Sequence, residues 1–237
     1  MIHKTAIVDK KAEISSDVKI GPYCVIGPDV KIGSNTILHS HVNIDGNTSI
    51  GSNNEIFPFC SIGTPPQDLK YKGEKNSLII GNNNKFREYV NINPGTLSGG
   101  SVTKIGNKNL LMVYSHIAHD CVVEDEVVLA NNVQVGGHVL IQNKAIIGGS
   151  CAIHQFSRIG QSAMIGGMTG VLSDVIPFGL SFGNRNNLSG LNLIGLRRAG
   201  ISNSDIKIMQ ESYKVIFETS SFRSNIENLD LKLKNNK

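Results

Sequence analysis

The chain has 237 residues, 40% of them hydrophobic, which is enough to bury a sizeable core. Its formal net charge of +4 is too small for a protein that binds nucleic acid through its charge. No apolar run approaches the roughly 20 residues that a membrane-spanning helix requires. The first residues carry scattered charges and no apolar segment, so we expect no signal peptide and a cytoplasmic protein.

Large apolar residues recur at every sixth position. The series runs without a slip over 2–62, resumes over 80–92 and resumes again over 105–171. A helix requires spacings of three and four, and a half-buried strand a spacing of two, so a period of six fits neither. It predicts short strands and tight turns that wrap into coils, which stack to bury one continuous core.

A small or β-branched residue stands two positions before most of these apolar residues. The four cysteines, Cys24, Cys60, Cys121 and Cys151, all fall on this small inward position, and none belongs to a CxxC motif. We therefore interpret them as core residues and not as metal ligands or disulfide partners.

The predicted fold is an all-β solenoid, a parallel β-helix over residues 1–183. Three six-residue sides give about eighteen residues per coil and a prism roughly 40 Å long. Loops at 64–77 and 93–104 interrupt it. Residues 184–237 are predicted to form a C-terminal helical region. Its first helix follows a capping box at Ser202 and Asp205, and a weaker helix covers 225–234.

Four of the seven histidines fall within one stretch of the repeats, at His116, His119, His138 and His154. At about eighteen residues per coil, the last three come within one residue of a column on successive coils. Imidazole titrates near neutral pH and also binds metals. The group therefore suits two chemistries: a general base acting on a sugar hydroxyl, or a zinc enzyme of the hexapeptide-repeat carbonic anhydrase type.

Loops that interrupt a regular solenoid are candidates for function, because the coils themselves need only structure. The first loop is polar and carries Gln67, Asp68 and Lys70. An equally weighted interpretation is that it covers an edge or contacts a neighbouring subunit.

Several short segments resemble the UDP-N-acetylglucosamine acyltransferase family, which begins lipid A synthesis. They are QDLKY at 67–71, IAHDC at 117–121, LANN at 129–132, GGH at 136–138, HQF at 154–156 and IGLRR at 194–198. The resemblance covers nearly the whole chain. It implies a left-handed β-helix and a homotrimer with active sites between subunits, with no cofactor and no metal.

By this resemblance, His119 is the general base that activates the 3-hydroxyl or 3-amino group of the UDP-sugar. Asp120 orients His119, and the backbone N–H of Gly137 stabilises the oxyanion. The acyl donor is a 3-hydroxyacyl chain on acyl carrier protein. The implied substrate-binding residues are Gln67, Asp68, Lys70, His116, His138, His154, Gln155, Asn192 and Arg198. Those of the acyl-chain pocket are Met164, Gly167 and Arg185. Because acyl carrier protein is acidic, Arg197, Arg198, Lys207 and Arg223 are candidates for its docking surface, and an equally weighted interpretation is that each is an ordinary solvated charge.

The chain departs from the family pattern at a few positions. Ile194 stands where many members have a carboxylate, and Ala199 where some have a third basic residue. The second loop begins with NPGT at 93–96, where many members have HRGT. The length of the acyl chain and the choice between a hydroxyl and an amino acceptor stay open.

Overall fold

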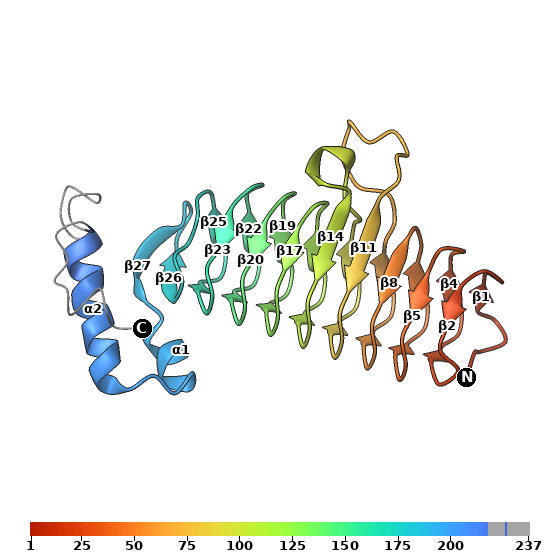
Figure 1. Ribbon diagram of the computed structural model, residues 1–237, viewed down its shortest axis with the longest axis horizontal. Coiled ribbons are helices and arrows are strands. Elements are labelled where there is room, and N and C mark those ends of the chain that lie inside the picture. The colour runs from red at the N-terminus through yellow and green to blue at the C-terminus, as the bar shows by residue number, and fades with distance from the viewer. Residues whose placement is uncertain (218–225, 227–237) are drawn as a thin grey trace.

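The computed structural model describes residues 1–217 and 226, and it shows a long prism of stacked coils with helices beyond its last coil (Figure 1). The fold is the left-handed parallel β-helix that the six-residue period and the resemblance predict. Each coil contributes one strand to each of three sheets, so a strand pairs with the strand one coil away rather than with its neighbour in sequence.

The three sheets are named here in the order in which the chain enters them. The first sheet contains β1 (Ile7–Val8), β4 (Val25–Ile26), β7 (Asn43–Ile44), β10 (Ser61–Ile62), β13 (Asn91–Ile92), β16 (His116–Ile117), β19 (Gln134–Val135), β22 (Ala152–Ile153) and β25 (Gly170–Val171). The second sheet contains β2 (Glu13–Ile14), β5 (Lys31–Ile32), β8 (Thr48–Ile50), β11 (Ser77–Ile80), β14 (Val102–Ile105), β17 (Val122–Val123), β20 (Leu140–Ile141) and β23 (Arg158–Ile159). The third sheet contains β3 (Lys19–Ile20), β6 (Ile37–Leu38), β9 (Glu55–Ile56), β12 (Lys85–Phe86), β15 (Leu110–Leu111), β18 (Val128–Leu129), β21 (Ile146–Ile147), β24 (Met164–Ile165), β26 (Gly179–Phe182) and β27 (Asn187–Leu191).

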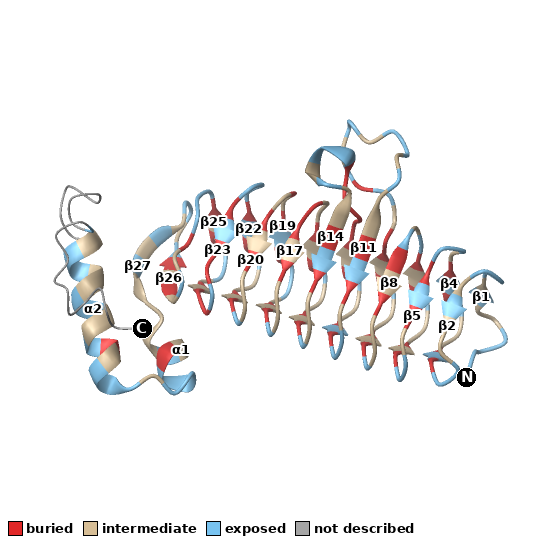
Figure 2. Cartoon of the chain, viewed as in Figure 1, coloured by how far each residue is buried: buried red, intermediate tan, exposed pale blue. Residues whose placement is uncertain are grey.

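The six-residue period marks residues that are buried along the strands (Figure 2). Ile26, Ile44 and Ile62 are register partners on successive strands of the first sheet, and each is at most 2% exposed. Burying such a side chain stabilises the fold by about 1.5–3 kcal/mol. The repetition of this contact along each sheet holds the coils together.

The corners between strands are tight turns with one residue in the left-handed conformation. Asp120 (φ 60°) and His138 (φ 61°) are two of the many non-glycine residues at such positions. The conformation costs roughly 1–2 kcal/mol per residue. Coil-to-coil hydrogen bonds hold it, as from the N–H of His138 to the carbonyl of His119 at 3.0 Å.

The prediction that the cysteines are core residues is confirmed: all four thiols are free and buried. Burial raises the pKa of each thiol, to about 12 for Cys60 and for Cys121. The thiolate is the reactive form. We therefore expect Ellman's reagent to modify no cysteine in the native protein at pH 8 and to modify Cys24, Cys60, Cys121 and Cys151 after unfolding in guanidinium. Rapid modification of the native protein would contradict this burial.

Two loops leave the prism side by side at the corner between the first and second sheets (Figure 1). Loop 1 (residues 63–76) joins β10 to β11, and loop 2 (residues 93–101) joins β13 to β14 and contains a short 3₁₀ helix, η1 (Leu97–Gly99). Both end earlier than predicted, because residue 77 and residues 102–104 extend the strands β11 and β14. The Asn76 Nδ2 donates to the carbonyl of Gly95 at 2.8 Å, so the loops support each other.

Beyond the last coil, β27 pairs with β26 in antiparallel fashion, and α1 (Leu193–Arg198) and α2 (Asn203–Phe217) follow. The region expected to be helical thus begins with a strand at residues 187–191. The N-cap of the predicted capping box is present, since Ser202 Oγ accepts a hydrogen bond from the N–H of Asp205 at 3.1 Å, while Asp205 Oδ2 accepts from the Ser202 hydroxyl at 2.6 Å. The helix predicted over 225–234 lies, except for residue 226, outside the described residues. The domain boundary after residue 183 stays a prediction.

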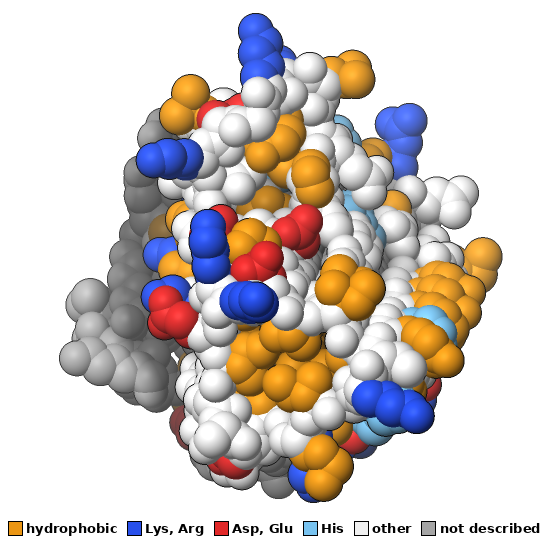
Figure 3. Space-filling view, turned by 90° about the vertical axis from the view of Figure 1, so that its right-hand side faces the viewer, with side chains coloured by type: hydrophobic (Ala, Val, Ile, Leu, Met, Phe, Trp, Pro, Cys, Tyr) orange, Lys and Arg blue, Asp and Glu red, His pale blue; other side chains and the backbone are white. Residues whose placement is uncertain are grey.

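None of the helices in the described part of the chain is long and apolar enough to cross a membrane. Apolar side chains gather at the N-terminal end of the prism (Figure 3), where Met1 and Ile2 are 86% and 52% exposed. The coils in the middle of the prism are more fully buried, and His116, His119 and His138 lie there.

Candidate active site

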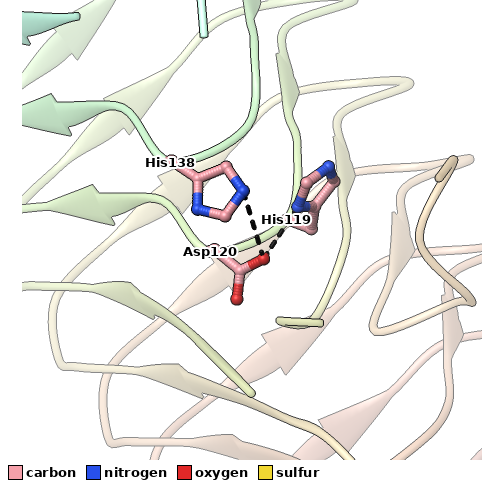
Figure 4. A group of neighbouring side chains, drawn as sticks. All are labelled: His119, Asp120 and His138. Atoms are coloured by element: carbon pink, nitrogen blue, oxygen red, sulfur yellow. Dashed lines mark hydrogen bonds and ion pairs between the residues drawn. The ribbon is translucent and has the colours of Figure 1, made fainter. Parts of the chain in front are cut away.

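His119 and Asp120 form a hydrogen-bonded pair at the corner that follows β16 (Figure 4). The distance from His119 Nδ1 to Asp120 Oδ2 is 2.8 Å. Adjacent residues in a strand face opposite sides, but the left-handed turn at Asp120 brings the two side chains together. Because a carboxylate oxygen only accepts hydrogen bonds, Nδ1 of His119 carries the proton and Nε2 is the basic nitrogen.

Loop 2 covers the carboxylate of Asp120, whose side chain is 0% exposed. Thr96 donates to it twice, from its N–H to Oδ1 at 2.9 Å and from its Oγ1 to Oδ2 at 2.6 Å. A Cβ built on Gly99 would collide with the carboxylate, so the loop backbone packs directly against it. The N–H of Asp120 donates to Thr103 Oγ1 at 2.8 Å. The sequence marked loop 2 as a candidate but did not single out Thr96, Gly99 or Thr103.

Gly137 lies beneath the imidazole of His119. A Cβ at this position would stand 2.6 Å from Cε1 and 2.8 Å from Nε2 of that ring, so only glycine leaves room for it. Within residues 1–217 and 226, no hydrogen-bond acceptor contacts the Gly137 N–H. A donor without a partner beside the basic nitrogen suits a developing oxyanion.

His138 completes the group at this corner. Its ring meets the ring of His119 edge-on at 5.1 Å between centroids and stacks on Phe156 at 4.5 Å. Its Nε2 lies 3.9 Å from Asp120 Oδ2. The ligand atoms of His119, Asp120 and His138 lie within 4.8 Å of one another, which a metal ion could bridge. Such an ion would compete with the hydrogen bonds that both carboxylate oxygens already accept from Thr96 and His119.

His116 precedes this group on β16 and is held as a neutral ring. Its Nδ1 donates to Asn91 Oδ1 at 2.7 Å. Burial lowers the pKa of His116, and the neighbouring His119 acts in the same direction. Its Nε2 is therefore an acceptor at neutral pH, which suits a hydrogen bond from a sugar hydroxyl.

The coil register shows how the histidines of the predicted column lie relative to one another. Ile117 pairs with Val135, so His119 stands level with Gly137, and His138 stands level with Asp120. His154 lies apart from both: it is exposed, and its Nδ1 donates to the carbonyl of Gln155 at 3.0 Å. The three histidines therefore come within one residue of a column, as predicted, but residues one position apart at a corner point in different directions.

The other implied binding residues lie elsewhere on the same chain. Gln67 and Lys70 are exposed on loop 1, where the N–H of Lys70 donates to Asp68 Oδ1 at 2.9 Å. Among the described residues, no contact joins them to His119. Leu69 between them is fully exposed.

Asn192 and Arg198 line a groove of about 550 Å³ on the third sheet, together with Met164. Asn192 also holds α1 in place, because its Oδ1 accepts from the N–H of Gly195 at 2.9 Å and its Nδ2 donates to the carbonyl of Ser162 at 3.0 Å. The third sheet faces away from the corner that carries His119.

The two remaining residues of the implied acyl-chain pocket are both exposed. Gly167 follows β24 at the next corner, and Arg185 lies in the turn between β26 and β27.

A β-helix of hexapeptide repeats with a histidine–carboxylate pair at one corner defines a hexapeptide transferase. The family described as bacterial transferase hexapeptide (six repeats) matches residues 11–46 and 103–137. Domain 2 of Udp N-acetylglucosamine O-acyltransferase matches residues 174–237. The chain belongs to the UDP-N-acetylglucosamine O-acyltransferase family, as its relatives show.

Three of these relatives illustrate the similarity. The acyl-[acyl-carrier-protein]--UDP-N-acetylglucosamine O-acyltransferase of Aliarcobacter butzleri is 51% identical over 92% of this chain and 84% of the relative. The enzyme of the same name from Thermodesulfovibrio yellowstonii is 53% identical over 91% of this chain and 84% of the relative. The solved structure of LpxA from Acinetobacter baumannii has a TM-score of 0.94 at 49% identity and covers 99% of this chain and 90% of that one. These names favour acyl transfer over the zinc alternative.

Proposed function

We propose that this protein transfers a 3-hydroxyacyl chain from acyl carrier protein to the 3-position of UDP-N-acetylglucosamine, in the cytoplasm, as the first step of lipid A synthesis. The observation that carries this proposal is the His119–Asp120 pair, whose basic nitrogen lies over Gly137. Membership of the acyltransferase family supports the donor and the acceptor.

The proposed mechanism uses His119 first as a base and then as an acid. Nε2 takes the proton from the 3-hydroxyl (or 3-amino) group, and the freed nucleophile attacks the thioester carbonyl. The carbonyl oxygen becomes an oxyanion that accepts a hydrogen bond from the N–H of Gly137. The carbon–sulfur bond then breaks, and His119 returns the proton to the departing thiolate. Asp120 favours each step by fixing the tautomer and by stabilising the charged imidazolium.

We further propose that the active site lies between copies of the chain in a homotrimer. In one chain, His119 and the groove of Asn192 and Arg198 lie on different sides of the prism. Loop 1 leaves the prism at the corner that also carries His119 and extends outward (Figure 1), with Lys70 exposed. A substrate that contacts His119, the groove and Lys70 together therefore requires a second copy of the chain. Loop 1 extends far enough from the prism to contact such a copy.

The groove and the helices suit the ends of the two substrates. Lys144 and Arg198 line the groove and favour a diphosphate, although Glu126 also lies there and Ile194 adds no polar group. Arg197 and Lys207 are exposed on α1 and α2 and suit an acidic carrier protein. Arg223 lies outside the described residues.

An acyl-transfer assay tests the proposed function. Purified protein is mixed with UDP-N-acetylglucosamine or its 3-amino analogue and with 3-hydroxyacyl carrier proteins of several chain lengths, and products are detected by mass. We expect one acyl product at a preferred length. The absence of transfer to either acceptor, together with zinc in the purified protein, would instead favour a zinc enzyme of the carbonic anhydrase type.

Complementation tests whether the site is shared between chains. We expect the single variants His119→Ala and Lys70→Ala to be impaired and their 1:1 co-assembled mixture to regain activity. In random closed trimers, about one quarter of the interfaces would pair an intact His119 with an intact Lys70 of the neighbour. Sedimentation of the mixture as trimers is the control. A mixture no more active than its components would place both residues in one chain and contradict the shared site.

A further inference from the structure

The carboxylate of Asp120 depends on one residue of loop 2 for most of its hydrogen bonds. Thr96 donates to Oδ1 through its N–H at 2.9 Å and to Oδ2 through its hydroxyl at 2.6 Å. His119 supplies the third donor, at 2.8 Å to the same Oδ2. Within the described residues, no lysine or arginine forms an ion pair with this carboxylate.

A buried carboxylate without a cation requires hydrogen-bond donors to stay charged, since transfer out of water disfavours the ion. The Asp120 side chain is 0% exposed, and the Thr96 residue is 2% exposed. Water therefore does not replace the Thr96 hydroxyl. Without this donor, loop 2 holds the carboxylate through Oδ1 alone, and Oδ2 keeps only its hydrogen bond with His119.

We propose that Thr96 is a positioning residue: it fixes the carboxylate of Asp120 and, through it, the tautomer and orientation of His119. This inference rests on the proposed role of His119 as general base. Thr96 contacts Asp120 and is itself buried, so it acts through Asp120 and not on substrate. Gly99 supports the same arrangement of loop 2 and Asp120, because the absence of a Cβ at residue 99 lets the loop pack against the carboxylate.

The insertion of loop 2 explains how Thr96 reaches this place. In a regular coil, a corner residue stacks on the corresponding residue of the next coil, 18 positions away, as in the register of Ile117 and Val135. In the coil that contains loop 2 the spacing is 25 residues, since Ile92 pairs with Ile117. Thr96, 24 residues before Asp120, therefore comes within one residue of level with it and lies directly against it. The turn of η1 then brings Gly99 to the same carboxylate.

The test compares two substitutions that differ by one hydroxyl. Thr96→Val keeps the shape and the backbone donor but removes the hydroxyl, and we expect kcat for acyl transfer to fall about 10- to 100-fold with KM changed less than about threefold. Thr96→Ser restores the hydroxyl and should recover kcat to within about threefold of the parent protein. Thr36→Val is the matched control, because Thr36 is also fully buried and its hydroxyl donates to the carbonyl of Gly51 at 3.1 Å, far from the site.

Thr36→Val should lower the melting temperature about as much as Thr96→Val and leave kcat unchanged. Three kinetic results would overturn the proposal: a normal kcat in Thr96→Val, an equal loss in Thr96→Ser, or an effect on KM alone. If Thr96→Val fails to fold, Gly99→Ala carries the same test. Its Cβ displaces the loop from Asp120, and an unchanged kcat there would also overturn the proposal.

A second readout does not depend on activity. The ¹⁵N chemical shifts of the His119 ring, assigned with His119→Gln, report which nitrogen carries the proton. We expect the Nδ1–H form in the parent protein and in Thr96→Ser, and a mixture of tautomers in Thr96→Val. Identical shifts in all three would overturn the proposal even if transfer is observed. If the parent protein transfers no acyl chain, the proposed function fails, and these shifts still decide the role of Thr96.

Discussion

Replacement of His119 by Ala should lower kcat for acyl transfer by a factor of about 10² or more while the protein stays folded, because the general base is lost. The His119 side chain is 15% exposed and contributes little to the core. Asp120 keeps both hydrogen bonds from Thr96 in this variant, so its burial remains satisfied. The destabilisation should therefore stay near 1 kcal/mol, the usual value of one hydrogen bond.

The measurement is kcat with saturating acyl carrier protein and UDP-sugar, together with thermal melting. His3→Ala is the matched control, since His3 is exposed and its ring bonds only to the neighbouring Thr5. It should behave like the parent protein in both measurements. A kcat near normal in His119→Ala would remove this residue from the chemistry and, with it, the mechanism proposed above.

The architecture could be predicted from the sequence because the residues that recur every sixth position are the ones whose side chains fill the core. Each coil buries large apolar residues at a fixed interval of six, which sets the length of one side, and the structure shows three such sides per coil. Handedness is different. Parallel crossovers are normally right-handed, and no residue of this chain overrides that rule by itself, so the left-handed twist follows from the resemblance.

The sequence did not predict where the two loops end or that residues 187–191 form a strand, and the reason is the same in both cases. Residues 102–104 and 187–191 gain their strand conformation from a neighbouring strand, β11 in one case and β26 in the other. Residues 187–191 read NLSGL, which has low β-propensity, and pairing at the end of the third sheet overrides that preference.

In the candidate site, too, some residues could be predicted from the sequence and others could not. The stretch around His119, Asp120 and Gly137 is visible as a motif, and the structure brings these three residues together. Their contacts with Thr96 and Gly99 are not visible, because an inserted loop has no place in the six-residue count and its register with the next coil is set only on folding. The shared-site prediction is hidden for a further reason, since one chain cannot display residues of another.

Gly137→Ala should have the second-largest effect on activity, because it moves the catalytic ring without removing it. Gly137 has no left-handed φ, so its backbone accepts alanine. The new Cβ would stand 2.6 Å from Cε1 of His119, closer than carbon atoms approach, and the ring must shift. A displacement of about 1 Å at a catalytic group reduces turnover by roughly 10²-fold. Overpacking should also cost about 1–3 kcal/mol of stability.

Gly33→Ala separates the two effects. A Cβ at Gly33 would lie 2.7 Å from the carbonyl carbon of Gly51, which is similar crowding in coils distant from the site. We expect both variants to melt at lower temperature and only Gly137→Ala to lose kcat, with KM for the UDP-sugar nearly unchanged. If both variants lose turnover equally, the defect lies in the stability of the solenoid. If neither does, the ring of His119 tolerates displacement, and its position beside Gly137 is not critical for transfer.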